Sequence, residues 1–165
     1  TLPGSCRSAG CYPTAEGDTA AMPDEVPSNA FALPLVVAEA MVDVQQRVSN
    51  HEYVRILSRT AEEHSTSLGW GLEAYRRLGA WWVVRRHEVD YLQPARLGDE
   101  LVCFTWPCGV SKAMAQRRHV LWRPADEAVI LRALTPWALI DVASERPRRI
   151  PAELIETFDP AKWVS

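Results

Sequence analysis

The chain has 165 residues, of which 47% are hydrophobic, and its net charge is −3. This length fits one domain with a sizeable core, and the charge supplies no overall basic field for binding nucleic acid. No apolar run reaches the roughly 18 residues of a membrane-spanning helix, and no secretory signal peptide is evident.

Four cysteines, Cys6, Cys11, Cys103 and Cys108, form no CxxC pair and no Cys/His spacing suited to zinc. We interpret all four as free thiols in the reducing cytoplasm. The histidines show no metal-ligand spacing, and the chain contains no P-loop, GxGxxG or GxSxG motif. The sequence therefore predicts a cytoplasmic protein that uses no metal or organic cofactor and binds neither nucleic acid nor a membrane.

Residues 1–29 are rich in Gly, Pro, Ser, Thr and Ala, which predicts a flexible N-terminal tail. Residues 30–165 are expected to form a single domain. Its first element is the apolar segment from Phe31 to Asp43, which we predict to be a strand. Pro34 indicates that this strand is an edge strand or contains a bulge, because proline cannot donate a backbone N–H.

The longest helical pattern follows this strand. Ser49 or Asn50 is a suitable N-cap, and Gly69 is a suitable helix stop. A shorter helix is expected over Leu72–Leu78. The apolar residues of the long helix recur at spacings of three and four, which places His64 among core residues. They are Tyr53, Val54, Ile56, Leu57, Ala61, His64 and Leu68.

From Trp81 onward the pattern alternates, as in strands. The turn at residues 124–127 predicts a hairpin between the last two strands. Pro136 indicates a bulge or bend in the final strand. A terminal helix is expected from Ala152 to about Phe158, with Pro151 suited to its first turn. The predicted strands are Trp81–Tyr91, Glu100–Trp106, Ala113–Arg123 and Ala128–Asp141.

One strand, a long helix and four antiparallel strands predict an α+β domain, with the helix on the concave face of a curved sheet. The start of the helix is also a chemical feature, because Asp43 precedes it closely. A helix N-terminus offers free backbone N–H groups and a partial positive charge. A carboxylate offers a base or a nucleophile.

Three segments carry a resemblance to a known family. DVQQRVSNHEY, from Asp43 to Tyr53, is similar to the D-x-x-x-H-V-N-N-x-x-Y signature of the hotdog-fold thioesterases. VDYLQPARLGDE (Val89–Glu100) resembles a later strand and turn of that family. TPW (Thr135–Trp137) with RPRRIP (Arg146–Pro151) resembles its last strand and tail. The chain thus resembles the 4-hydroxybenzoyl-CoA and acyl-carrier-protein (acyl-ACP) thioesterases over roughly residues 33–158.

The resemblance implies a hotdog fold, a long central helix wrapped by a curved antiparallel sheet, and hydrolysis of an acyl-CoA or acyl-ACP thioester. In that family the residue at the position of Asp43 is the catalytic carboxylate. A backbone N–H at the helix start, here that of Asn50 or His51, polarises the thioester carbonyl. The family's sites are shared between subunits, which implies a homodimer or a tetramer. Substrate contacts are expected from Arg47, Tyr53 and Tyr91, with core packing as the alternative for the tyrosines.

The chain departs from the family pattern within the loop. The usual Gly, His and first Asn are replaced by Gln46, Arg47 and Ser49. In the plant acyl-ACP branch an Asn and a His take part in catalysis, and Gln45 and Arg47 occupy their positions. An Asp-based mechanism is therefore the one that remains. Arg47 either pairs with Asp43 or contacts the substrate.

We expect a role in fatty acid metabolism, or in polyketide or other secondary metabolism. Two other functions stay open. A hotdog dehydratase or hydratase would need His51 or His64 near Asp43 across a dimer. A non-catalytic thioester-binding protein would fit the replaced His and Asn.

Glu63, on the predicted solvated face of the helix, is an alternative to Asp43 as the catalytic carboxylate. The basic residues that either bind a CoA or phosphopantetheine phosphate or lie on a solvated strand pair are Lys112, Arg117 and Arg118.

Overall fold

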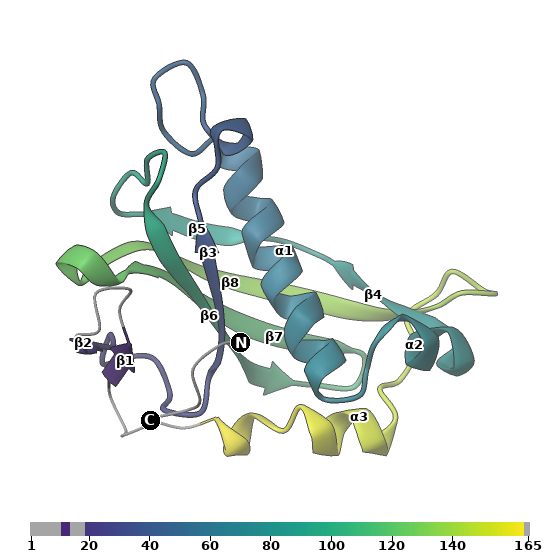
Figure 1. The fold of residues 1–165 in the computed structure, drawn as a ribbon. Helices are drawn as coiled ribbons and strands as arrows, with labels where there is room; N and C mark the ends of the chain where they lie inside the picture. Colours follow the sequence, from purple (N-terminus) through teal and green to yellow (C-terminus); the bar gives the residue numbers. More distant parts are fainter. Residues whose placement is uncertain (1–10, 14–18, 164–165) are drawn as a thin grey trace.

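A computed structural model describes residues 11–13 and 19–163 of the chain. One long helix, α1 (Asn50–Ser67), lies against a curved antiparallel sheet (Figure 1). The sheet consists of β3 (Phe31–Val36), β4 (Ala80–Val84), β5 (Glu88–Tyr91), β6 (Glu100–Val110), β7 (Met114–Arg123) and β8 (Ala128–Asp141). Its order is β3-β6-β7-β8-β4, and β5 also pairs with β8.

Two short helices, α2 (Leu72–Leu78) and α3 (Ala152–Thr157), accompany α1 at the end of the molecule where α1 finishes (Figure 1). The α+β prediction is confirmed. The two helices predicted after the first strand, α1 and α2, are present with nearly the predicted bounds. The final helix ends one residue before the predicted Phe158. None of the described helices is long and apolar enough to cross a membrane.

The main core lies between α1 and one face of the sheet. Ile56 and Leu57 of α1 pack in one cluster with buried residues of β6, β7 and β8. Leu57 is 1% exposed, and burying such a side chain stabilises the fold by roughly 1.5–3 kcal/mol. The strand residues of this cluster include Leu101, Cys103, Leu121, Ile130, Leu131 and Ala133.

The opposite face of the sheet is covered by residues near the N-terminus. Alternate residues of β6, such as Phe104, point away from α1 and pack with Ala20, Val26 and Ala30. Two short strands, β1 (Cys11–Pro13) and β2 (Thr19–Ala21), pair with each other. Residues 1–10 and 14–18 of the predicted tail lie outside the described ranges. Within those ranges the segment differs from a free tail, because Ala20 and Val26 are each 6% exposed.

The first strand is shorter than predicted. β3 ends at Val36, a 3-10 turn follows over Glu39–Met41, and Asp43 lies in the loop beyond it. The cause is the partner strand. Val36 faces Glu100, the first residue of β6, so the chain beyond Val36 has no strand to pair with. The prediction from Pro34 is confirmed, because β3 forms an edge of the sheet and pairs only with β6 among the described strands.

The predicted strand Trp81–Tyr91 is two strands, and Pro136 explains the break. β4 stops at Val84, β5 starts at Glu88, and both pair with β8. The carbonyl of Pro136 accepts a hydrogen bond from Arg85 N–H over 2.9 Å, but proline has no N–H to return. β8 itself is continuous over Ala128–Asp141, and its ladder with β7 has no register shift at Pro136, so the bulge predicted at that residue is wrong. The interruption falls in the neighbouring strands instead. The shift in the β7–β8 ladder lies at Ile130, between Val129 and Leu131.

Candidate functional site

Asp43 lies in a hairpin loop between the 3-10 turn and α1. The segment leading into α1 projects beyond the sheet, at the end of the molecule where α1 begins (Figure 1). Val42 and Val48 form an antiparallel bridge, and Asp43 N–H donates to the Arg47 carbonyl over 2.8 Å. Oδ1 of Asp43 accepts hydrogen bonds from the N–H groups of Gln45 (2.8 Å) and Arg47 (3.2 Å). Among the described residues, Oδ2 has no hydrogen-bond or ion-pair partner. The carboxylate thus stabilises its own loop and keeps one oxygen available.

The loop keeps a left-handed residue where the family pattern has glycine. Gln46 has φ +59°, and its N–H donates to the Asp43 carbonyl over 2.9 Å. The left-handed conformation costs a residue with a side chain roughly 1–2 kcal/mol relative to its preferred backbone. Gln46 therefore adopts a backbone conformation that glycine would adopt without this cost.

The first turn of α1 has two free donors. The Ser49 carbonyl accepts from the N–H groups of Glu52 (3.0 Å) and Tyr53 (3.3 Å). The N–H groups of Asn50 and His51 have no acceptor in the described part of the chain, and both residues are exposed. Free N–H groups at a helix N-terminus stabilise negative charge on an oxygen atom.

Within one chain, Asp43 and these donors do not converge. The Val42–Val48 bridge aligns Asp43 with Arg47, three residues before Asn50. Three extended residues span about 10 Å, so Asp43 stands at the outer end of the hairpin and the helix start at its base. The sequence predicted only that Asp43 closely precedes the helix. The 3-10 turn and the hairpin carry the loop outward from the helix start.

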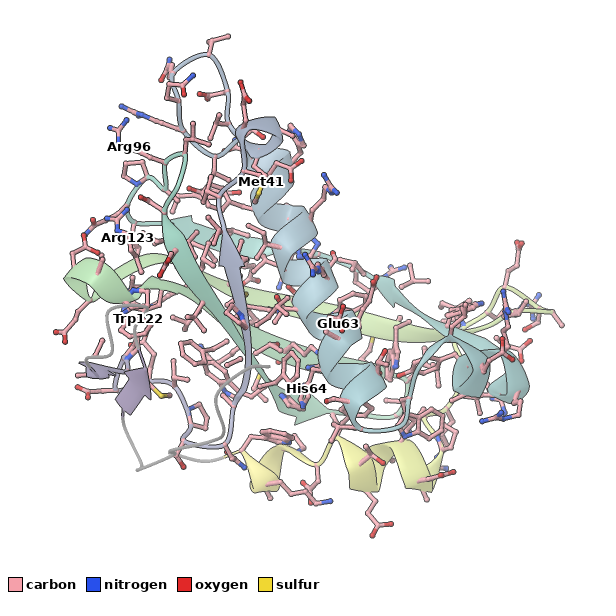
Figure 2. All side chains as sticks on the ribbon, viewed as in Figure 1. Met41, Glu63, His64, Arg96, Trp122 and Arg123 are labelled. Atoms are coloured by element: carbon pink, nitrogen blue, oxygen red, sulfur yellow. The ribbon has the colours of Figure 1, made fainter. Side chains whose placement is uncertain are left out.

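Arg47 makes no ion pair with Asp43, since only its backbone N–H and carbonyl contact that residue. Its side chain is exposed. Arg47 forms an antiparallel bridge with Arg96, which is exposed on the turn between β5 and β6. Arg96 and Met41 lie at the end of the molecule where α1 begins, while His64 lies near its other end (Figure 2). Two arginines from different loops therefore stand beside the hairpin that carries Asp43.

A buried carboxylate at the helix start was missed by sequence reasoning. Glu52 is 6% exposed, and its Oε1 lies 2.7 Å from Nη1 of Arg55 and 3.3 Å from Nε2 of His51. His51 is itself 75% exposed in its side chain, and its Nδ1 lies 3.1 Å from Ser49 Oγ. The spacing Ser49-x-x-Glu52, typical of a capping box, was the available signal. Here the glutamate turns to its neighbours on the helix rather than back to the cap.

The two candidate tyrosines differ in exposure. Tyr53 is 5% exposed, and its hydroxyl accepts a hydrogen bond from the buried Ala95 N–H over 3.1 Å. Burial raises the pKa of Tyr53. Tyr91 is 48% exposed, with its ring centre 5.5 Å from that of Tyr53. Tyr53 thus supports the loop from inside, and Tyr91 is the one accessible to a ligand.

A cavity of about 460 Å³ lies at the other end of α1. Its walls come from the C-terminal part of α1, from α2 and α3, and from the end of the sheet near β4. None of the predicted site residues Asp43, Asn50 and His51 lines it. Its polar lining includes Glu62 and Ser65 of α1. Aromatic side chains dominate the lining: Trp70, Tyr75, Trp81, Trp82, Trp137 and Phe158.

Arg117 of β7 lines this cavity, so the prediction of a solvated strand pair is wrong for that residue. Its Nη1 donates to His64 Nδ1 over 2.7 Å, and its guanidinium carbon lies 5.3 Å from the ring centre of Phe158. Burial lowers the pKa of Arg117 to about 10. Lys112 and Arg118 are exposed, as predicted.

The inner face of β7 carries a second unexpected polar residue. His119 is 1% exposed, and neither ring nitrogen has a hydrogen-bond partner among the described residues. His64, predicted to be a core histidine, is likewise buried, and only its Nδ1 is partnered. Alternation along β7 puts Arg117 and His119 on the face of Leu121, a signal present in the sequence. No group of three or more metal-binding side chains occurs in the described ranges.

Comparison with known proteins gives a family match. Residues 29–158 match the family model described as the N-terminal domain of acyl-ACP thioesterases. No curated protein sequence matches the chain.

Solved structures share the fold. A hypothetical protein of Staphylococcus aureus, in complex with CoA, superposes with a TM-score of 0.78 at 14% identity, over 85% of this chain and 89% of that one. A Lactobacillus plantarum protein described as an oleoyl thioesterase gives 0.75 at 18% identity, over 79% of this chain and 51% of that one. A Bacteroides thetaiotaomicron acyl-ACP thioesterase gives 0.68 at 19% identity, over 73% and 49%. This chain thus spans about half the length of the last two proteins. The predicted hotdog fold is confirmed.

Proposed function

This chain belongs to the family of acyl-ACP thioesterase N-terminal domains, and from that premise we propose that it hydrolyses an acyl thioester to a free acid and a thiol. One observation carries the proposal. Asp43 is held by two backbone N–H groups in the loop that leads into α1, and the first N–H groups of α1 are free. A carboxylate and an oxyanion-binding helix terminus are the two parts that thioester hydrolysis requires.

The proposed chemistry uses Asp43 as a base or as a nucleophile. As a base, its free Oδ2 takes a proton from water while the water oxygen bonds to the thioester carbonyl carbon. The N–H of Asn50 or His51 stabilises the negative charge on the carbonyl oxygen. The C–S bond then breaks, and the departing thiolate takes up the proton. As a nucleophile, Asp43 bonds to the carbonyl carbon, and the C–S bond breaks to release the thiolate. Water then hydrolyses the acyl anhydride, which gives the free acid, restores the Asp43 carboxylate and leaves a proton for the thiolate.

We further propose that two copies of the chain complete the site, as a homodimer or within a tetramer. The separation of Asp43 from the helix start in one chain supports a contribution from a partner. β4 pairs with β8 on one side, and its other edge is unpaired among the described residues. Trp81 and Val83 are 37% and 44% exposed there. An apolar edge strand of this kind favours pairing with a second copy.

The proposed substrate carries a phosphopantetheine arm, either as CoA or on an acyl carrier protein. Arg47 and Arg96 stand exposed beside the hairpin of Asp43 and are suited to the phosphate of this arm. Tyr91 is the exposed aromatic side chain proposed to contact the substrate. The S. aureus protein in complex with CoA supports CoA as the carrier. The Bacteroides acyl-ACP thioesterase supports an acyl carrier protein.

Replacing Asp43 by Asn tests the proposal directly. The Asn side-chain oxygen accepts the same two N–H hydrogen bonds, so the loop is retained while the base is lost. We expect thiol release from a panel of acyl-CoA and acyl-ACP thioesters to fall by roughly 10²–10⁴-fold. The control is Glu39→Gln, an exposed carboxylate in the preceding 3-10 turn, with unchanged turnover expected.

Full activity of the Asp43→Asn variant would remove the proposed mechanism. The same panel separates hydrolysis from the two other hotdog functions. Consumption of a 2-enoyl thioester without thiol release would instead show a hydratase, and binding without any turnover would show a non-catalytic protein.

A further inference from the structure

The guanidinium of Arg117 lacks a counter-charge. No carboxylate of the described residues lies within ion-pair distance of it, although Glu62 lines the same cavity. Its protein contacts are His64 Nδ1 and the face of Phe158, and neither carries a negative charge. Holding a charge partly out of water without a partner is unfavourable, so such a position favours a bound anion.

The free nitrogens of Arg117 suggest the shape of that anion. Only Nη1 has a hydrogen-bond acceptor, and in the described part of the chain Nε and Nη2 have none. Two N–H groups on one side of a guanidinium match the two oxygens of a carboxylate. The nearby polar groups are already occupied, because the Tyr75 hydroxyl accepts from Trp82 Nε1 (2.9 Å) and lies 2.8 Å from Ser65 Oγ.

The aromatic lining of the cavity indicates which kind of apolar group the ligand carries. Four tryptophans, a tyrosine and a phenylalanine surround about 460 Å³, a volume suited to a small organic molecule. Aromatic walls bind flat apolar groups by offset or edge-to-face contacts. The cavity therefore combines an apolar, aromatic interior with one cationic anchor.

We infer that this cavity binds a small hydrophobic carboxylic acid, with its carboxylate on Nε and Nη2 of Arg117 and its apolar body against the aromatic walls. The site is distinct from the loop of Asp43, since no residue of that loop lines the cavity. The inference does not depend on the proposed hydrolysis.

Titration of the full chain with 2-naphthoate, followed by tryptophan fluorescence and calorimetry, tests this site. The neutral isostere 2-naphthalenemethanol reports apolar binding alone. We expect the acid to bind about tenfold to a hundredfold more tightly than the alcohol, as is typical of hydrogen bonds to charged groups. Arg117→Met should remove this preference and leave alcohol binding within about threefold. Arg118→Met is the matched control, because it removes an exposed arginine on the opposite face of β7 and should change neither affinity.

Equal affinity of the wild-type chain for acid and alcohol would overturn the inference, as would an Arg117→Met variant that keeps the preference. If that variant does not fold, Arg117→Lys serves instead, and it should retain part of the preference. Asp43→Asn should bind 2-naphthoate normally, so failure of the hydrolysis proposal is distinguishable from failure of this one.

Discussion

Nη1 of Arg117 donates a hydrogen bond of 2.7 Å to Nδ1 of His64, from β7 to α1. Because a guanidinium has only donors, His64 must accept through Nδ1 and carry its proton on Nε2. Burial and the adjacent charge of Arg117 lower the pKa of His64 to about 3. The same two causes lower the pKa of His119 to about 3. Burial, reinforced by one cation between helix and sheet, thus keeps two interior histidines neutral.

These histidines predict a loss of stability in mild acid. Between about pH 6.5 and pH 3, the unfolded chain binds a proton at each histidine that the folded chain does not. Stability is therefore complete above pH 6.5 and falls by about 1.4 kcal/mol per pH unit for each histidine as the pH drops. Urea unfolding from pH 7 to pH 4.5 measures this slope. His119→Phe should reduce this slope by about 1.4 kcal/mol per pH unit, which corresponds to one proton. An unchanged slope would show that His119 does not contribute to the loss of stability.

Proline at the start of α1 tests the oxyanion donor. Asn50 is the first helical residue, where proline is well tolerated, and Ser49 has the extended backbone that proline prefers before it (φ −73°, ψ 153°). Asn50→Pro and His51→Pro each remove one N–H of the first turn, and the helix tolerates proline best at Asn50. We expect the variant that loses the donor to reduce kcat by roughly 10²–10³-fold. Asn50→Ala and His51→Ala keep the N–H and serve as controls. Normal kcat in both proline variants would exclude this helix terminus from catalysis.

The left-handed Gln46 makes a prediction about stability. Gln46→Gly relieves the side-chain conflict at φ +59° and should leave the free energy of unfolding unchanged or raise it by up to about 1 kcal/mol. Gln46→Val places a β-branched side chain there and should lower it by about 1–2 kcal/mol. Denaturant unfolding of the two variants gives the comparison. Equal stabilities would show that the loop leaves this conformation in solution.

The β4 edge predicts the oligomeric state. Light scattering coupled to size exclusion should give a multiple of the 18.5 kDa chain mass. The double substitution Trp81→Lys and Val83→Lys puts charges on the proposed interface and should yield a monomer with little turnover. Val36→Lys changes an exposed apolar residue on β3, at the opposite end of the strand order, and should leave the assembly intact. A monomeric wild-type chain with full activity would contradict the shared site.

Tyr53 separates support of the loop from contact with substrate. Tyr53→Phe leaves the buried Ala95 N–H without its acceptor and should lower the free energy of unfolding by about 1–3 kcal/mol. Tyr91→Phe, at the exposed neighbour, should change stability by less than about 0.5 kcal/mol. Measurement of KM for the same pair completes the test. A raised KM with unchanged stability in Tyr53→Phe would make its hydroxyl a substrate contact.

Local patterns in the sequence were sufficient for most of the architecture. The period of the apolar residues and the capping residues predicted α1 and α2, and proline chemistry predicted that β3 is an edge strand. Ordered motifs along the chain predicted the hotdog fold. These features depend on neighbours within a few residues, so they can be read from one segment at a time.

Only the tertiary structure decided how the chemical groups are arranged. A hairpin register, set by the Val42–Val48 bridge, carries Asp43 away from the helix start. Alternation along β7 put Arg117 and Arg118 on opposite faces, but it did not say which face α1 would cover. The cavity that receives Arg117 is built from segments far apart in the chain. Burial and charge balance depend on such long-range packing, which local periodicity does not contain.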